Sequence, residues 1–498
     1  MSAYMKPSTL ASLYDFDKPD VEQGFEIRSD TIDPLTTSSR RVKFRLEPIG
    51  YLDSNSMLLF KMKGPDAADE YRASCVTGGL GAIKMARLSV GDTILSETQE
   101  CGRVLFMDKF SKLDRDSMSR RHAHYLGNSF TSVAPDAALA PEAAASGQVV
   151  MSDKCGAYFG TPATYANRVV RSQAIRADVD DNYQVGILLG DLFPCLKRAG
   201  SIRTLPLYLF DQYRIYIDIE FEDGDKFVNK LDGAAPGAGV SPLLQAAATD
   251  ISYSDIKLQV DYVIMPSGIL DADRAETNKD GGLTLNYYDY LVVEKVLADQ
   301  GGVAEQDTEF RIGAQERDVH AVTMLKQFTD AVGTEFSGRN RALMLNNVCD
   351  AVNKESYQVT VNGVDRYPFF IESPATQYDL LSYGVGGEPE MERPFLFQDD
   401  NDFDSGITTA QSGLAGTYKP LSCDLRNGLP VVVGGGTQIG KYPIIWKYKR
   451  TGTAGAAGGG LTTRNKMDGP ASVDFVIKAS KQARVMSTPV GMDITVAV

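Results

Sequence analysis

The segment Arg214-Ile-Tyr-Ile-Asp-Ile-Glu-Phe221 alternates apolar with polar side chains along its whole length. Successive side chains of a β-strand point to opposite faces, so one face carries the three isoleucines and Phe221. The other face carries Arg214, Asp218 and Glu220, which we expect to point toward water. A strand with one apolar and one polar face is typical of an antiparallel sheet that covers a core on one side.

The same two-residue period recurs elsewhere in the chain. Ile256–Asp261 and Tyr357–Val361 follow it, and Val473–Lys478 follows it less cleanly. We therefore predict that each of these segments is a half-buried strand of an antiparallel sheet.

Two short turns are expected to join neighbouring strands. Gly91-Asp92 separates the strand-like run 83–90 from 93–95, and Asn362-Gly363 follows the predicted strand that ends at Val361. Asn-Gly is a strong hairpin signal because both residues readily adopt positive φ.

Helix signals are few and short. Ser96-Glu-Thr-Gln99 has the spacing of a capping box, which predicts a helix over 101–112. Residues 191–200 are predicted to form one brief helix that ends at Gly200. Strands outnumber helices throughout, which favours an all-β protein.

Composition and charge narrow the function. With 498 residues, 43% of them hydrophobic and 23% charged, the chain has an ordinary globular mixture. β-Sandwich domains commonly reach about 200–250 residues, so the length accommodates two. A net charge of −14 makes direct nucleic-acid binding unexpected. The basic cluster at 115–124 is interleaved with Asp114 and Asp116 and is interpreted as a solvated surface or a subunit contact.

The cysteines and the N-terminal sequence give no sign of export. Six cysteines lie far apart without a C-x-x-C pair, and no secretory segment precedes them, so we predict mostly buried free thiols. No apolar run approaches the length of a membrane span, and Ser2 stands where N-myristoylation requires glycine. We therefore expect a soluble intracellular product.

Several segments are predicted to lie outside the cores. Residues 1–40 mix Pro, Asp, Ser and Thr and are interpreted as an N-terminal arm. The small-residue stretches 134–147, 233–248 and 451–461 are interpreted as long surface loops. The polar stretch 271–282 is expected to separate two β-rich halves, 41–270 and 283–498.

Two segment groups in the first half and at its end carry a family resemblance. Gly186–Pro194, Leu205–Leu209 and Tyr213–Phe221 are similar to a strand, short helix, Leu-Pro-Leu segment and returning strand. Farther along the chain, the Val-Asp-Tyr strand Leu258–Ile264 precedes an acidic-arginine turn at Asp271–Ala275 and the run Tyr287–Glu294.

A third group, Val359–Tyr367, contains an Asn-Gly and Asp-Arg hairpin. Taken in this order over about residues 180–370, the three groups resemble the double jelly-roll major capsid proteins of eukaryotic DNA viruses. That group includes virophages, polinton-like viruses and nucleocytoplasmic large DNA viruses. The resemblance implies an all-β double jelly roll, that is, two fused eight-stranded antiparallel sandwiches with long surface loops and few short helices.

The same resemblance implies a function in assembly. Members form pseudo-hexameric homotrimers that tile an icosahedral shell, with neighbouring capsomers, penton proteins and minor capsid proteins as partners. Residues 41–270 would then be the first jelly roll and 283–498 the second, with the arm contacting neighbours. The expected location is the virion capsid, assembled inside the host cell, and contact with an inner membrane stays open.

Two loops resemble ligand-binding motifs, but neither has the required residues at the required positions. Gly435–Lys441 fits a phosphate-binding loop, but Tyr442 replaces the Ser or Thr that must reach magnesium, and a strand-like run follows Pro443. The acidic loop 399–406 suggests calcium, yet its glycine comes one residue late for an EF-hand and position twelve is Gln411 rather than Glu. It is interpreted as a solvated loop whose cation binding stays open.

No enzyme is predicted, and no catalytic, cofactor-binding or metal residue is proposed from the sequence. Zinc would need His122 and His124 plus distant ligands, and a nucleophile elbow is not visible. The alternative from another class is a carbohydrate-binding or glycoside-hydrolase β-sandwich protein. It expects exposed aromatic residues, whereas the single tryptophan, Trp446, lies in a strand and is predicted to be core.

Overall fold

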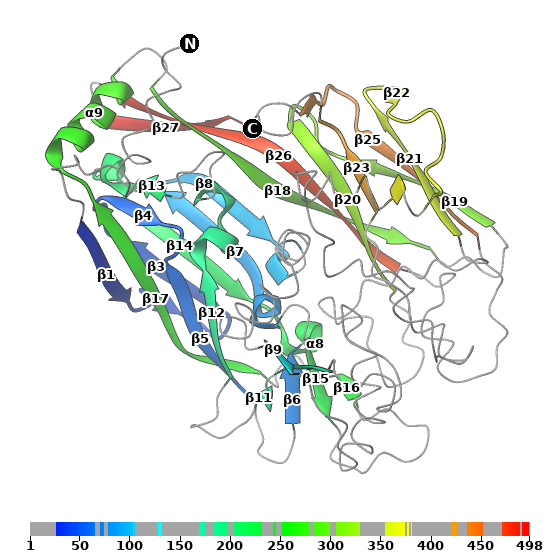
Figure 1. Cartoon of the computed structure of the whole chain (residues 1–498), viewed down its shortest axis with the longest axis horizontal. Helices are drawn as coiled ribbons and strands as arrows, with labels where there is room; N and C mark the ends of the chain where they lie inside the picture. The colour runs from blue at the N-terminus through cyan, green and yellow to red at the C-terminus, as the bar shows by residue number, and fades with distance from the viewer. Residues whose placement is uncertain are drawn as a thin grey trace.

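The fold is described from a computed structural model of the chain. The described residues are 26–64, 70–73, 78–102, 104, 128–131, 169–172, 174–175, 183–196, 204–231, 243–245, 251–278, 282–298, 305–328, 354–373, 376–377, 380, 421–426, 436–451, 471–488 and 491–497. Two β-sandwiches lie side by side along the longest axis of the molecule (Figure 1).

The first sandwich consists of two antiparallel sheets. One contains, in spatial order, β12 (Tyr183–Leu188), β5 (Met57–Lys63), β17 (Ser252–Ile264), β4 (Tyr51–Asp53) and β13 (Thr204–Pro206), with β1 (Glu26–Ile32) also paired to β17. The facing sheet contains β2 (Thr36–Thr37), β3 (Arg41–Leu46), β14 (Ile215–Phe221), β7 (Ile83–Val90) and β8 (Thr93–Gln99).

The second sandwich is built the same way. One sheet contains β18 (Leu283–Leu297), β26 (Ala471–Thr488), β20 (Asp318–Phe328) and β23 (Leu421–Asp424), with β24 (Thr437–Gln438) paired to β20 and β27 (Gly491–Ala497) paired to β26. The facing sheet contains β19 (Glu305–Ile312), β25 (Ile444–Thr451), β21 (Lys354–Val361) and β22 (Val364–Asp365).

Both sandwiches repeat one pairing scheme. In each, the opening strand pairs with a long late strand, β1 with β17 and β18 with β26. The facing sheets also correspond strand for strand, as β3-β14-β7-β8 and β19-β25-β21-β22. Strands distant in sequence therefore become neighbours in the same order twice, which indicates two copies of one antiparallel topology rather than two unrelated domains.

Smaller elements connect or extend the sandwiches. A four-stranded sheet contains β11 (Ala174–Ile175), β6 (Glu70–Ala73), β15 (Val228–Leu231) and β16 (Leu243–Gln245), and β10 (Val169–Ser172) pairs with β9 (Asn128–Thr131). The short helices are η2 (Gly78–Ala82), α7 (Leu189–Leu192), η5 (Pro194–Leu196), η6 (Leu207–Phe210), α8 (Gly224–Phe227) and α9 (Ser267–Thr277). Among the described residues, no helix combines the length and the apolar character that crossing a membrane requires.

Strand β14 has the apolar face that the sequence predicts. The three isoleucines are fully buried and Phe221 is 2% exposed. The opposite face differs from the prediction at Asp218, which is only 7% exposed. The reason is that β14 lies between β3 and β7, so side chains of its neighbours cover it, and Arg41 approaches the Asp218 carboxylate to 3.6 Å.

The other predicted strands also form, with different burial. β17 keeps the predicted alternation, with Leu258 and Val260 fully buried. In contrast, β26 is buried on both faces over Val473–Ile477, since Val476 packs in the first core whereas Val473, Phe475 and Ile477 pack in the second. The prediction of a half-buried strand is therefore wrong there, because an alternating pattern reports one covered face and does not reveal a second layer that packs on the other. It is also wrong for β21, where Gln358 and Thr360 on the polar face are only 7% and 9% exposed.

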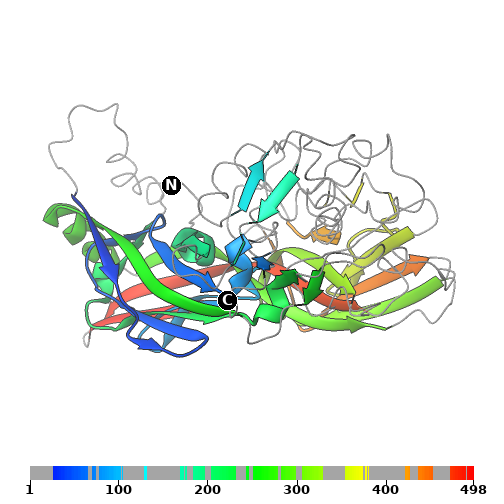
Figure 2. The same ribbon diagram turned by 90° about the horizontal axis from the view of Figure 1, so that it is seen from below.

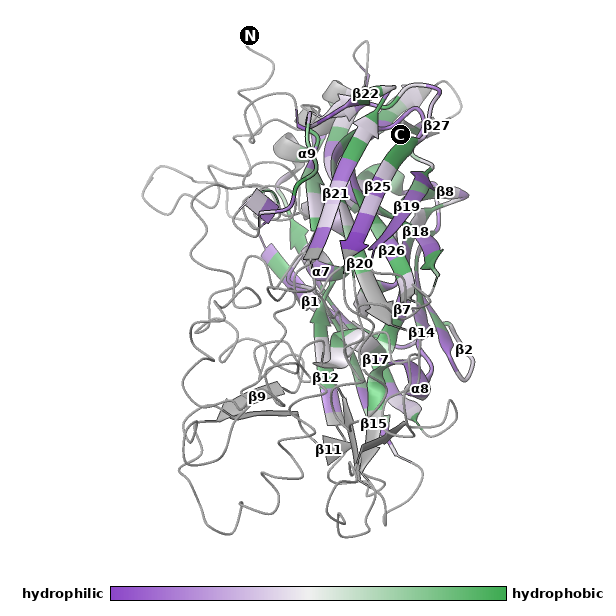
Figure 3. Cartoon of the chain, turned by 90° about the vertical axis from the view of Figure 1, so that its right-hand side faces the viewer, coloured by the Kyte–Doolittle hydropathy of each residue, from purple (hydrophilic) through white to green (hydrophobic). Residues whose placement is uncertain are grey.

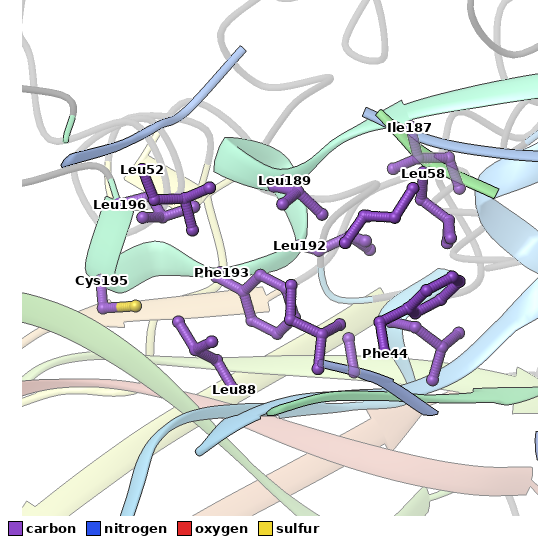
Figure 4. Close-up of a cluster of buried hydrophobic side chains, with 14 of the residues drawn as sticks. Phe44, Leu52, Leu58, Leu88, Ile187, Leu189, Leu192, Phe193, Cys195 and Leu196 are labelled. Atoms are coloured by element: carbon purple, nitrogen blue, oxygen red, sulfur yellow. The ribbon is translucent and has the colours of Figure 1, made fainter. Parts of the chain in front are cut away.

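The short helices α7 and η5 pack in the first core. Side chains of α7 and η5 point toward Leu52, Leu58 and Leu88, which come from both sheets (Figure 4). The segment was predicted as a single helix over 191–200, and that prediction is wrong in its start and continuity. The helix begins at Leu189 and breaks at Phe193, because Pro194 has no amide hydrogen to continue it. The predicted end at Gly200 lies outside the described residues.

The predicted capping box is wrong as well. Ser96-Glu-Thr-Gln99 is the end of strand β8, where Ser96 pairs with Leu88 of β7. Helical bonding starts one residue later, with the Val104 amide donating to the Glu100 carbonyl. Cys101 and Gly102 are helical, where the predicted helix over 101–112 begins, and residues 105–112 lie outside the described residues. Pairing across the Gly91-Asp92 turn with β7, whose Leu88 lies eight residues before Ser96, satisfies the backbone groups, so the capping-box motif does not decide the structure.

Both predicted hairpins are confirmed. Gly91 has φ of 59° between β7 and β8. Asn362 and Gly363 have φ of 52° and 82° between β21 and β22, the conformation that makes Asn-Gly favourable in a tight turn.

The segments predicted to lie outside the cores are partly described. Strand β1 comes from the stretch interpreted as an arm, and residues 1–25 lie outside the described residues. Helix α9 occupies 271–277 of the stretch expected to separate the halves. Strand β16 lies within 233–248, whereas 134–147 and most of 451–461 are outside the described residues.

One ribbon of strands belongs to both cores. The start of β18 and the end of β26 contribute Leu285, Tyr287, Ala483 and Val485 to the first core, while Leu297 and Phe475 belong to the second. Figure 2 shows β26, in red, passing from one sandwich to the other. The Tyr287 hydroxyl donates to the Leu95 carbonyl of β8 at 2.5 Å, so the ribbon is bonded to the first sandwich. The two halves are thereby packed into one body.

Candidate functional site

The glycine loop that fits a phosphate-binding pattern is part of a sheet. Thr437 and Gln438 form β24 against β20, and β25 follows Pro443 instead of a helix. A side chain at Gly436 would come within 2.7 Å of the Val319 carbonyl oxygen, so this glycine allows close approach of two backbones. Without a helix N-terminus the loop lacks the dipole and amides that bind phosphate.

His320 is a structural histidine. Its side chain is 3% exposed, its Nε2 lies 2.6 Å from the Ser480 hydroxyl, and Asp318 is 3.5 Å away. Burial lowers the pKa of the imidazole, and the nearby cations Lys478 and Arg426 act in the same direction. The ring is therefore neutral at pH 7 and held inside the sheet.

The other metal candidates lie outside the described residues. These are His122, His124, the basic cluster 115–124 and the acidic loop 399–406. Within the described part of the chain, no three His, Cys, Asp or Glu side chains gather in a way that could hold a metal ion.

Three cysteines are free and buried, as predicted for the described part of the chain: Cys101, Cys195 and Cys423. Desolvation raises the pKa of the Cys101 thiol well above its ordinary value and raises that of Cys423 to about 12. Both thiols are protonated at neutral pH, so neither is an activated nucleophile.

Exposed apolar side chains gather at the outer end of the second sandwich. Val364 is 70% exposed, Phe369 59%, Phe370 36% and Tyr442 69%. We call these four residues the apolar end. Figure 3 looks onto this side of the molecule, where β19, β25 and β21 run next to one another and β22 lies at their tip.

The hairpin turn holds the two parts of the apolar end together. The Asn362 side-chain amide donates to the Gln438 carbonyl at 2.9 Å, and its oxygen accepts from the Gly440 amide at 2.7 Å. These bonds fasten the segment that leads to Tyr442 beside the turn that leads to Val364.

The segment carrying the two phenylalanines is also fixed at both ends. Arg366 donates its amide to the Val359 carbonyl, and its guanidinium reaches the Arg426 carbonyl at 3.0 Å. At the other end Ile371 and Tyr357 exchange backbone hydrogen bonds. The segment between them keeps Phe369 and Phe370 at the surface, so little ordering entropy is lost when a partner covers them.

The core beneath this surface is aromatic. Trp446 is fully buried, as predicted, and its ring stacks on Tyr357 with centroids 4.9 Å apart and planes 6° apart. Tyr357 also exchanges backbone hydrogen bonds with Ile371, so this stack is connected to the segment that carries the two phenylalanines. A fixed, exposed apolar surface is suited to contact another protein. Sequence reasoning assigned no residue of it to a contact and named Tyr442 only as the residue that breaks the phosphate-binding pattern, although the adjacent phenylalanines after the predicted hairpin were an available signal.

Comparison with known proteins adds the overall fold. No protein-family model and no curated protein matches the sequence. Among solved structures, VP54 of PBCV-1, fitted into a reconstruction of the virophage Sputnik, aligns over 95% of this chain and 97% of its own, with a TM-score of 0.52 and 9% identity. The PBCV-1 capsid aligns over 96% and 97%, with a TM-score of 0.51 and 10% identity.

The chain is a double jelly roll. The Sputnik virophage structure agrees, with a TM-score of 0.50 over 96% of this chain and 90% of that one, at 9% identity. The predicted fold class is thus confirmed. Each alignment extends over nearly the full length of this chain, so it includes both copies of the repeated pairing, β1-β17 and β18-β26.

Proposed function

We propose that this chain is a major capsid protein of a DNA virus, whose copies form homotrimeric, pseudo-hexameric capsomers that tile an icosahedral shell. The observation that carries the proposal is the full-length likeness to the PBCV-1 capsid, which covers 96% of this chain and 97% of that one. Both sandwiches and their relative placement are therefore matched, not a single common β-domain.

The apolar end supports association between copies. Its residue Val364 lies in β22, at the upper margin of the second sandwich, and the first sandwich lies on the other side of the molecule (Figure 1). A contact between this end and a different surface of the next copy is heterologous, and such contacts close into a ring when the rotation permits. Three copies of a body with two similar sandwiches give six sandwiches around a threefold axis, which produces a roughly hexagonal outline.

The finer parts of the proposal concern partners and domains. We infer that neighbouring capsomers, penton proteins and minor capsid proteins are partners, that the N-terminal segment contacts neighbours and that the protein is located in the virion. The division into two jelly rolls near 271–282 stays a prediction. It is supported by the two repeated sheets and by helix α9 between β17 and β18.

Imaging of the purified protein by negative-stain electron microscopy tests the proposal. Particles with a hexagonal outline and three copies per particle are expected. A glycan-binding screen on the same sample covers the alternative carbohydrate-binding or glycoside-hydrolase function. Single-copy particles that bind a defined glycan would overturn the capsid proposal.

A further inference from the structure

Strand β1 is an open edge of the first sandwich. It pairs with β17 over all seven residues, and β17 uses its other side for β4 and β5, since Leu258 pairs with both Ile32 and Leu58. Among the described residues no other strand pairs with β1. Figure 1 shows β1 at the outer margin of the molecule. Its outward backbone groups can therefore accept another strand.

The side chains of this edge lie at the surface. Ile27 is 53% exposed, and the side chains of Arg28 and Asp30 are 47% and 41% exposed. Arg28 and Asp30 form an ion pair of 3.3 Å along the strand. An exposed edge with an exposed isoleucine needs either a partner or a feature that prevents pairing.

We propose that β1 pairs antiparallel with β1 of a second copy of this chain, across a twofold axis that passes through Ser29. In this register Arg28 stands opposite Asp30 of the other copy, and the reverse contact is identical by symmetry. The four charges alternate in sign on one face of the joined sheet. On the other face Ile27 stands opposite Thr31, a pair of β-branched side chains that packs well across strands.

The charge pattern also selects this register. Two strands related by an axis perpendicular to the sheet pair residues of the same face, so the neighbouring registers centre on Arg28 or on Asp30. Centring on Arg28 places it against itself and places Glu26 against Asp30. Centring on Asp30 places that carboxylate against itself. Of the three registers, only the one through Ser29 avoids directly opposed like charges.

A free edge of the second sandwich, in the sheet that faces β18-β26-β20-β23, does not have this property. Strand β19 is the edge strand of its sheet and carries Glu305, Asp307 and Glu309 on one face. A twofold axis through Asp307 or Glu309 opposes that residue to itself, and an axis through Thr308 opposes Asp307 to Glu309. Every central register therefore sets one acid against another, which disfavours self-pairing.

The pairing goes beyond the proposed capsid role, because a twofold contact joins two copies whether or not those copies are trimeric. If they are trimeric, the contact joins one trimer to the next. Failure of the pairing would leave the trimer unaffected, and absence of the trimer would leave pairs of single copies, so the two proposals are separable by mass.

Charge reversal tests the register. Sedimentation over a concentration series measures the dissociation constant of the twofold contact, and hydrogen exchange measures protection of residues 27–32. Arg28→Asp and Asp30→Arg should each weaken the contact about tenfold, since each converts two attractive pairs to repulsive ones. The double variant R28D/D30R should restore it to within about threefold. The control Arg311→Asp, in an exposed ion pair of 3.4 Å on β19, should leave it unchanged.

Disulfide trapping gives an independent readout. Directly opposite residues of antiparallel strands have Cβ atoms about 4.5–5.5 Å apart, close enough for a disulfide after small adjustment. Under mild oxidation Ser29→Cys should give a covalent pair, whereas Thr31→Cys, on the same face, should not, because its own copy is four positions away. Trapping at both sites or neither overturns the register. If neither charge reversal changes the exchange protection of β1, another segment occupies the edge, and this result also overturns the proposal.

Discussion

Replacing Phe369 by serine should dissociate the proposed trimer without unfolding the chain. The Phe369 side chain is 59% exposed in the single copy, so its replacement should affect the contact between copies more than the packing within the folded chain. A phenylalanine side chain buries about 150–250 Å² of surface when it is fully covered. The part of Phe369 that is still exposed is therefore about 100 Å², which a partner can cover. At about 25 cal/mol per Å² the loss is about 2.5 kcal/mol for each contact.

A closed ring has three equal contacts, so the total loss of association free energy is about 7.5 kcal/mol. This corresponds to an increase of about 10⁵-fold in the trimer dissociation constant. Since that constant has units of concentration squared, the concentration for half-assembly should rise about 300-fold. Light scattering across a dilution series measures this, and the thermal midpoint of the dissociated chain should stay unchanged. Val296→Ser, which changes a 78% exposed valine outside the apolar end, is the matched control. Equal assembly of Phe369→Ser and wild type, or equal loss in the control, would refute the assignment.

Three further predictions concern stability. Lys481→Met should lower the free energy of unfolding by about 3 kcal/mol at pH 7. The reason is that it leaves the buried Asp289 carboxylate, 2.8 Å from the Lys481 ammonium, without its cation. Burial already raises the pKa of Asp289, so the loss should shrink in acid, where the carboxyl is neutral, as urea titrations at two pH values can show. Burial lowers the pKa of His320 below its value in the unfolded chain, about 6.5. The neutral imidazole should therefore contribute fully to folding stability above about pH 6.5, and this contribution should be lost as the pH falls below that value. His320→Asn should make the urea midpoint less dependent on pH in this range. Gly363→Ala should cost about 1 kcal/mol by calorimetry, because φ is 82° although space around a new Cβ is open.

The strands that sequence predicts correctly are those whose pattern reports a single covered face. Ile215, Ile217 and Ile219 of β14 are an example, and the Asn362-Gly363 turn is another, since its φ values depend on two residues alone. Such features are local, so the pattern suffices.

Two of the failures, at β26 and β1, share a long-range cause. The 473–477 segment is buried on both faces because Val476 packs in the first core, whereas Val473, Phe475 and Ile477 pack in the second. Strand β1 was interpreted as part of an arm, since the partner that orders it, β17, is more than 200 residues away in sequence. No local window contains these contacts.

That the four residues of the apolar end form one surface could not be predicted, for a related reason. Phe369 and Tyr442 are separated in sequence, and the Asn362 side chain brings their segments together through bonds to Gln438 and Gly440. Exposed aromatic residues in a chain of this size are also ordinary one at a time. Only their placement on one fixed surface marks them.

The mass of the purified chain in solution, measured by light scattering after size exclusion, tests the central claim most directly. A particle of three times 54.2 kDa, stable to dilution and to salt, is the predicted result. Mass equal to one chain at every concentration would contradict the capsid account.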